Sequence, residues 1–162
     1  MPVVDAEVRA VAARMLELMF EVEGIGLAAP QVGLPWRMFV CFVPESEDRS
    51  PTDDPPTASG EPSVYINPTL SGFSRDLVPY EEGCLSLPEI TGDVRRPSQV
   101  TIDALDENGR PFTARSADLL ARCWQHEMDH LDGVLIIDRM TPASRLKNRA
   151  AVKHLRDEAE DA

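Results

Sequence analysis

The sequence contains few of the residues that mark several common classes of protein. Among 162 residues there are three cysteines and three histidines, and aromatic residues make up 6% of the chain. The odd number of cysteines, without paired spacing, argues against a disulfide framework and favours free or metal-bound thiols. Long apolar runs are also absent, since glycine and proline interrupt uncharged stretches such as residues 24–36. We therefore expect no membrane-spanning segment.

Basic residues are scarce as well. The chain has 16 Lys+Arg against 28 Asp+Glu, a formal net charge of −12. Proteins that bind DNA or RNA without sequence preference depend on Lys and Arg to displace counterions from phosphates, so the composition argues against that class. Asp5 and Glu7 precede the first apolar residues of a periodic segment, which is not the pattern of a secretory signal peptide. We therefore expect a cytoplasmic protein.

The remaining composition is that of a globular chain. Hydrophobic residues make up 43% and charged residues 27%, and domains most often contain ~100 to 150 residues. This predicts a single domain over residues 1–162. Residues 44–63 differ from the rest, because they are rich in proline and acidic residues and lack large apolar side chains. We expect them to form a flexible acidic loop.

The spacing of apolar residues predicts a mixture of helices and strands. Helices are predicted at 8–22 with Asp5 as N-cap, at about 116–132 with Ser116 as N-cap, and at 142–162 with Leu146, Ala150 and Leu155 inward. Strands are predicted at 38–43, 64–70, 73–80, 100–104, 111–114 and 134–138. The elements do not alternate as βαβ units. An α+β fold is therefore favoured, with mostly antiparallel sheets packed around the central helix and a helix at the C-terminus.

The second predicted helix contains His126-Glu127-Met128-Asp129-His130, an H-E-x-x-H pattern. Residues four apart lie one helical turn above each other, so both imidazoles can reach one metal ion. Glu127 then lies beside that ion, where its carboxylate can take a proton from a metal-bound water. With three histidines in the chain, two at this spacing around a glutamate favour a metal site over a chance arrangement.

A catalytic ion needs a third protein ligand, and the three cysteines are the candidates. Cys123 lies on the same helical stripe as the histidines, but it could equally form the wall of a pocket. Cys41 lies within an apolar strand and is expected in the core. Cys84 follows Gly83 in the segment EEGCLSLP, where the backbone is not committed to a packed face. Cys84 is the favoured ligand.

Three segments, GIGLAAPQ at 24–31, EGCLS at 82–86 and QHEMDHL at 125–131, together resemble the signature motifs of peptide deformylase, in the same order. H-E-x-x-H alone is shared with many zinc peptidases. The resemblance implies removal of the N-formyl group from the initiator methionine of nascent polypeptides. It also implies one divalent ion held by Cys84, His126 and His130, with ferrous iron as the usual ion and zinc, nickel or cobalt as substitutes.

The same resemblance suggests a mechanism. Glu127 would act as general base towards a metal-bound water and then as general acid towards the leaving amine. The Gln31 side-chain amide and the Leu85 backbone N–H would stabilise the oxyanion. Substrate binding is assigned to the loop residues of the first two motifs and to a methionine pocket on the histidine stripe: Gly24, Ile25, Gly26, Gly83, Leu119 and Cys123. Glu82 and Arg96 match family positions and could form an ion pair that orients the Cys84 loop, with a solvated surface pair as the alternative.

Charge is unevenly distributed, because residues 145–156 contain five basic residues and no acidic one. We consider a ribosomal RNA contact through this stretch, with a solvated helix face as the alternative. A zinc endopeptidase with Glu158 as third ligand, and a metal- or peptide-binding protein without catalysis, are the competing hypotheses for the whole chain.

Overall fold

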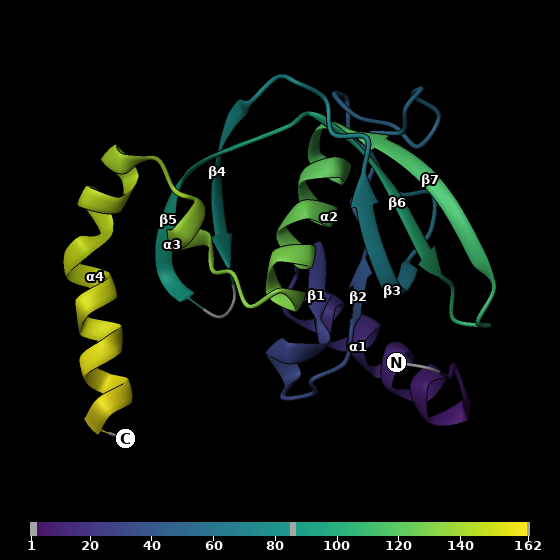
Figure 1. The fold of residues 1–162 in the computed structure, drawn as a ribbon, viewed down its shortest axis with the longest axis horizontal. Helices are drawn as coiled ribbons and strands as arrows, with labels where there is room; N and C mark the ends of the chain where they lie inside the picture. Colours follow the sequence, from purple (N-terminus) through teal and green to yellow (C-terminus); the bar gives the residue numbers. More distant parts are fainter. Residues whose placement is uncertain (1–2, 85–86, 162) are drawn as a thin grey trace. The chain divides into compact units, whose positions relative to one another are not determined.

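The structure, a computed structural model, describes residues 3–84 and 87–161 (Figure 1). The chain divides into two compact units. The first unit contains residues 3–76 and 97–133, and the second contains residues 77–96, apart from 85 and 86, and 134–161. The prediction of a single domain stays a prediction.

The first unit begins with helix α1 (Ala6–Glu21), which confirms the first predicted helix. Its N-cap is Asp5, whose side chain accepts a hydrogen bond from the Val8 N–H at 3.0 Å, as the sequence predicted. Apolar residues three or four apart form the buried face of the helix: Val8, Ala12, Met15 and Met19.

Five antiparallel strands form one sheet in this unit. In spatial order they are β1 (Gly26–Ala28), β2 (Met38–Cys41), β3 (Ser63–Ser71), β6 (Gln99–Leu105) and β7 (Pro111–Ala117). A short 3₁₀ helix, η1 (Ala29–Val32), follows β1. Strand β2 is buried on both faces, because Met38 and Val40 pack with α1 while Phe39 and Cys41 pack with helix α2 (Asp118–Leu131). The sheet therefore lies between the two helices (Figure 1).

Helix α2 begins later than the sequence predicted. Ser116 is not its N-cap but lies within β7, where it pairs with Val100 of β6 and is fully buried. The strand pairing continues to Ala117, opposite Gln99, so the backbone stays extended past Ser116. The ladder with β6 outweighs the capping preference of serine at this position.

The acidic segment between β2 and β3 makes several hydrogen bonds. Ser59 exchanges two with the Val43 backbone, at 2.8 and 3.0 Å. Thr57 and Ala58 are buried, and the Pro56 carbonyl accepts from the Ala117 N–H at 2.9 Å. Residues 56–59 of the loop are thus anchored to the first unit, while its predicted flexibility stays a prediction.

The second unit contains a two-stranded antiparallel sheet, β4 (Val78–Cys84) and β5 (Leu87–Arg96), and two helices, α3 (Ile136–Arg139) and α4 (Pro142–Asp161). The prediction of a strand at 134–138 was wrong, because residues 136–139 form helix α3. Ile136 and Met140, four residues apart, bury together with Ile90 and Val94, and the Asp138 side chain accepts from the Leu135 N–H at 3.0 Å. A helical turn thus buries both apolar residues on one side.

The C-terminal helix is confirmed as α4, but its buried face differs from the prediction. Leu146 is 70% exposed and Ala150 is also exposed, whereas Leu155 is partly buried. The buried positions are Ser144 and Asn148, whose side chains bond the β5 backbone at Asp93 N and Thr91 O, at 2.9 and 2.7 Å. Polar pairing with β5 at these two positions, together with the partly buried Val152 and Leu155, defines the face of α4 that packs.

The α+β class, the antiparallel sheets and the C-terminal helix are confirmed. None of the helices in the described part of the chain has the length and apolar character needed to cross a bilayer.

Candidate functional site

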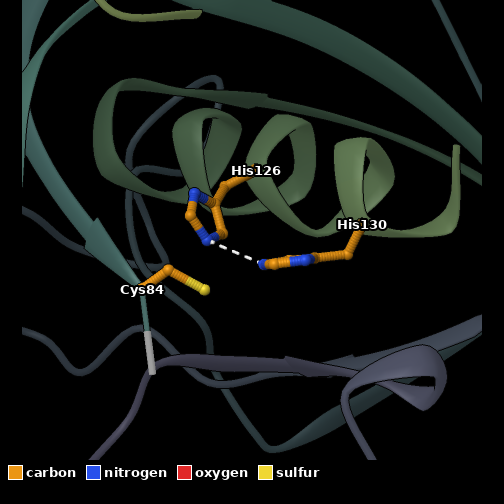
Figure 2. Close-up of side chains that lie close together, drawn as sticks. All are labelled: Cys84, His126 and His130. Atoms are coloured by element: carbon orange, nitrogen blue, oxygen red, sulfur yellow. Dashed lines mark hydrogen bonds between the residues drawn. The ribbon is translucent and has the colours of Figure 1, made fainter. Parts of the chain in front are cut away.

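His126 and His130 project from the same side of α2, one turn apart (Figure 2). Their Nε2 atoms lie 3.3 Å from each other, and both side chains are half-buried. Two imidazole ligands at ~2.0 to 2.1 Å from one tetrahedral ion have nitrogen atoms about 3.3 to 3.4 Å apart. The two histidines therefore already have the spacing that a shared metal ion requires.

Glu127 is 3% exposed and lies beside the histidine pair, with Oε1 3.9 Å from the His126 Nε2. The backbone of β1 covers it. A Cβ atom placed on Gly26 would lie 2.9 Å from the Glu127 Cγ and Oε1 atoms and 3.0 Å from the Cys123 Sγ. Any other residue at position 26 would thus displace Glu127 or the strand.

Gln31 lies in η1, immediately after β1. Its side-chain Oε1 accepts a hydrogen bond from the Ala28 N–H at 2.8 Å. Because the amide oxygen is used in this way, the orientation of the amide is set, and its NH₂ group is directed away from the Ala28 nitrogen. The side chain is therefore arranged to act as a donor.

The residues predicted to form a methionine pocket belong to one apolar cluster of the first unit. Cys123 is 3% exposed, and Ile25 and Leu119 are partly buried against the same cluster. The Ile25 carbonyl accepts from the Phe42 N–H at 2.8 Å and lies 3.5 Å from the Cys123 Sγ. The cluster has the residue types of an apolar pocket, and its use by a substrate stays a prediction.

In the second unit, Cys84 is half-buried at the end of β4 (Figure 2). The pairing of β4 with β5 shifts register at this point, from Gly83 opposite Thr91 to Cys84 opposite Leu87. The strand pairing is therefore irregular at Cys84, next to Gly83. Leu85, the predicted oxyanion donor, lies outside the described residues.

The predicted ion pair between Glu82 and Arg96 is confirmed. Arg96 donates from Nε and Nη2 to the two Glu82 carboxylate oxygens at 2.8 and 3.0 Å, and each side chain is 5% exposed. A bidentate pair of this kind holds both planar groups in one orientation. It joins β4 to β5 two residues before Cys84.

Some contacts around α2 were not predicted. Trp124 donates from its indole N–H to the Tyr65 hydroxyl at 3.0 Å, and burial raises the Tyr65 pKa well above its ordinary value. Cys41 and Cys123 place their sulfur atoms 3.1 Å apart. The sequence contains no signal for either contact, because the partners lie in distant segments that only the packing of the sheet against α2 brings together.

Comparison with known proteins gives one consistent result. The family model described as polypeptide deformylase matches residues 1–146. Peptide deformylase 2 of Gloeobacter violaceus is 50% identical over 137 residues, which are 85% of this chain and 68% of that protein. Peptide deformylase of Agrobacterium fabrum is 44% identical over 151 residues, covering 93% of this chain and 81% of that protein.

Solved structures show the same similarity. Peptide deformylase 1B of Arabidopsis thaliana, in complex with an inhibitor, matches with a TM-score of 0.86 and 36% identity, over 99% of this chain and 83% of that one. The peptide deformylase of Ehrlichia chaffeensis matches with a TM-score of 0.86 and 33% identity, over 99% and 88%.

Proposed function

This chain belongs to the polypeptide deformylase family and is an enzyme of that kind, and we propose that it hydrolyses the N-formyl group of the initiator methionine in nascent polypeptides and releases formate. The observation that carries the proposal is the His126–His130 pair at 3.3 Å with the buried Glu127 beside it, on a chain of this family.

We propose that Cys84, His126 and His130 hold one divalent ion, with Fe²⁺ as the ion in the cell and Zn²⁺, Ni²⁺ or Co²⁺ as substitutes. The spacing of the two imidazole nitrogens fits such an ion. One thiolate and two imidazoles suit a borderline transition metal and leave a coordination position for the reactants. When bound, the ion would act as a Lewis acid towards the formyl oxygen and lower the pKa of a water.

Glu127 is proposed as the general base and acid. Its carboxylate would accept the proton of the attacking water and return it to the leaving amine nitrogen. Burial at 3% exposure keeps bulk water from competing for this proton, and the contact with Gly26 limits where the carboxylate can move. Both features support a role in proton transfer.

Gln31 and the Leu85 N–H are proposed to bind the oxyanion. The hydrogen bond from Ala28 to the Gln31 Oε1 supports this role for Gln31, because it directs the NH₂ group towards a second partner. Donors that are already oriented stabilise developing charge without reorganisation.

Strand β1 is proposed to pair with the substrate peptide. It is the edge strand of its sheet and pairs with β2 along one side. An extended peptide can add to such an edge through main-chain hydrogen bonds. Gly24, Ile25 and Gly26 would make these contacts together with Gly83, and Ile25, Leu119 and Cys123 would receive the methionine side chain.

We also propose that the protein contacts the ribosome through residues 145–156 and that it is located in the cytoplasm. Along α3 and α4 the second unit has a groove of about 660 Å³, lined by four basic residues (Arg145, Arg149, Lys153 and Arg156), two acidic residues (Asp138 and Asp157) and apolar residues. The excess of cations over carboxylates in this groove suits a polyanion such as RNA. The endopeptidase alternative has less support, because Glu158 is 61% exposed and pairs with His154 at 3.0 Å.

The proposal is tested by loading the chain with Fe²⁺ or Ni²⁺ without oxygen and measuring formate release from a formyl-Met peptide. We expect turnover in the wild type, and Glu127→Gln should keep its metal but lose at least about 10²-fold in kcat. Metal analysis of Cys84→Ser and Glu158→Gln provides the control. Full metal content in Cys84→Ser, or no formate from a fully loaded wild type, would overturn the proposal.

A further inference from the structure

We propose that Cys41 of β2 and Cys123 of α2 form an oxidation site in the first unit. On oxidation the two thiols would form an intramolecular disulfide. Their sulfur atoms lie 3.1 Å apart, and the two residues are 0% and 3% exposed. Neither thiol is a proposed metal ligand, since that role belongs to Cys84. Cys123 contributes only its apolar surface to the proposed methionine pocket.

The geometry already brings the thiols close to bonding distance. A disulfide has an S–S length of about 2.0 Å, so the two sulfur atoms must approach by about 1 Å. The cysteines lie on facing elements of one apolar cluster and not on one strand or helix. The disulfide would therefore join two separate elements, and we expect side-chain rotation to close the remaining distance.

The reaction needs an oxidant, and a peroxide supplies it. The Cys123 sulfur attacks one peroxide oxygen, the O–O bond breaks, and sulfenic acid and water are formed. The Cys41 sulfur then attacks the Cys123 sulfur, forming the S–S bond, and the sulfenic oxygen leaves as a second water. In sum, two thiols lose two hydrogen atoms and one hydrogen peroxide is reduced to two waters.

The structure also indicates how the oxidant reaches the pair. Cys123 lies against the start of β1, because a Cβ atom placed on Gly26 would lie 3.0 Å from its Sγ. The same Sγ lies 3.5 Å from the carbonyl oxygen of Ile25, which precedes the strand. Strand β1 contains three residues, lies at the edge of the sheet, and pairs opposite Cys41 through Gly26. Short edge elements open more readily than central ones. Cys123 is therefore the thiol that oxidant meets first, and Cys41 is the one that resolves it.

The disulfide would change the molecule in a measurable way. It would connect β2 covalently to α2 and close a loop of about 80 residues, and closing a long loop stabilises a fold by restricting the unfolded chain. We expect the melting temperature of the apo chain to rise by at least about 3 °C after oxidation and to return after treatment with dithiothreitol.

Trypsin separates the three cysteines, which allows a direct test. Cleavage after arginine places Cys41 in peptide 38–49, Cys84 in 76–95 and Cys123 in 123–139. The full chain is treated with hydrogen peroxide, denatured in excess iodoacetamide, digested and analysed by mass spectrometry. We expect 38–49 joined to 123–139, with a mass lower by two hydrogen atoms than the sum of the reduced peptides.

Two variants make the result decisive. Cys84→Ser keeps both thiols of the pair and should give the same cross-linked peptide, whereas Cys41→Ala should give none and no rise in melting temperature. If Cys41→Ala does not fold, Cys41→Ser serves in its place. The proposal is overturned if Cys41 and Cys123 are both recovered alkylated after the peroxide treatment, or if Cys123 is recovered joined to Cys84.

Discussion

At the scale of single residues, the site depends on where small groups permit close packing. Glu127 takes its position from the backbone of β1, and the absence of a side chain at Gly26 is what permits that contact. Gln31 is oriented by one hydrogen bond from its own backbone neighbour. Neither residue is a proposed metal ligand, yet both define the space in which the proposed reaction takes place.

Gly26→Ala is expected to lower kcat by about 10²-fold, because the added Cβ atom would lie 2.9 Å from Glu127 and displace its carboxylate. The measurement is formate release by the metal-loaded enzyme. Gly60→Ala is the matched control, since its Cβ atom would meet only the Pro51 Cβ, at 3.8 Å. Equal loss in the two variants would contradict the steric argument.

Gln31→Glu separates the two functions of this side chain. A glutamate retains an oxygen for the Ala28 N–H but has no NH₂ group to donate to an oxyanion. We expect kcat to fall by roughly 10²- to 10³-fold while the melting temperature stays within about 2 °C of the wild type. Wild-type kcat in this variant would exclude the proposed donor role.

At the scale of elements, two different interactions hold the helices. Helix α2 packs through apolar side chains and a buried Trp124–Tyr65 hydrogen bond. Helix α4 packs Val152 and Leu155 against the apolar cluster of the second unit, and hydrogen bonds of Ser144 and Asn148 fix its first half to β5. A buried polar contact is costly to break from one side, because the remaining partner loses its hydrogen bond without regaining water.

Asn148→Ala is therefore expected to destabilise the second unit by about 1 to 3 kcal/mol, since the Thr91 carbonyl loses its donor. Leu146→Ser, two residues away on the same helix, should change stability by less than about 0.5 kcal/mol, because Leu146 is 70% exposed. Urea unfolding followed by circular dichroism measures both. A larger effect of the leucine substitution would show that α4 buries the face predicted from the apolar pattern.

At the scale of the whole molecule, the chain leaves the first unit after Asp76 and returns at Pro97. Asp76 lies at this crossing, and its carboxylate accepts hydrogen bonds from the Ser74 and Ser98 hydroxyls and from the Ser98 N–H. These bonds, those from the two serine hydroxyls first, lower the Asp76 pKa from 3.8 to about 2. These hydrogen bonds hold together the two points of the first unit at which the chain leaves it and returns to it.

The sign of the pH dependence follows from this shift. The folded state favours the ionised carboxylate, so Asp76 contributes stability above pH 3.8 and loses that contribution as the pH falls from 3.8 towards about 2. Asp76→Asn is expected to be less stable than the wild type at neutral pH, with the difference shrinking over this window. Urea midpoints measured at several pH values check it, and a difference that stays constant with pH would contradict the assignment.

The sequence alone determined the features that depend on local spacing. It placed α1 with its Asp5 cap, the strands β2, β3 and β6, and the histidine pair. The family resemblance suggested the Glu82–Arg96 pair, which the structure shows buried. Periodicity and motif spacing identify such features because each depends on residues that are close in sequence or on a known pattern.

Only the tertiary structure decided which side chains meet across distant segments. In the structure Ser116 lies in a strand, residues 136–139 form a helix, and α4 buries Asn148 instead of Leu146. Two contacts join distant segments: Gly26 with Glu127, and Cys41 with Cys123. Strand pairing and polar contacts with other elements outweigh local preference at these positions. The physical reason is that each of these contacts stabilises the fold only when two segments distant in sequence meet, and they meet only in the folded chain.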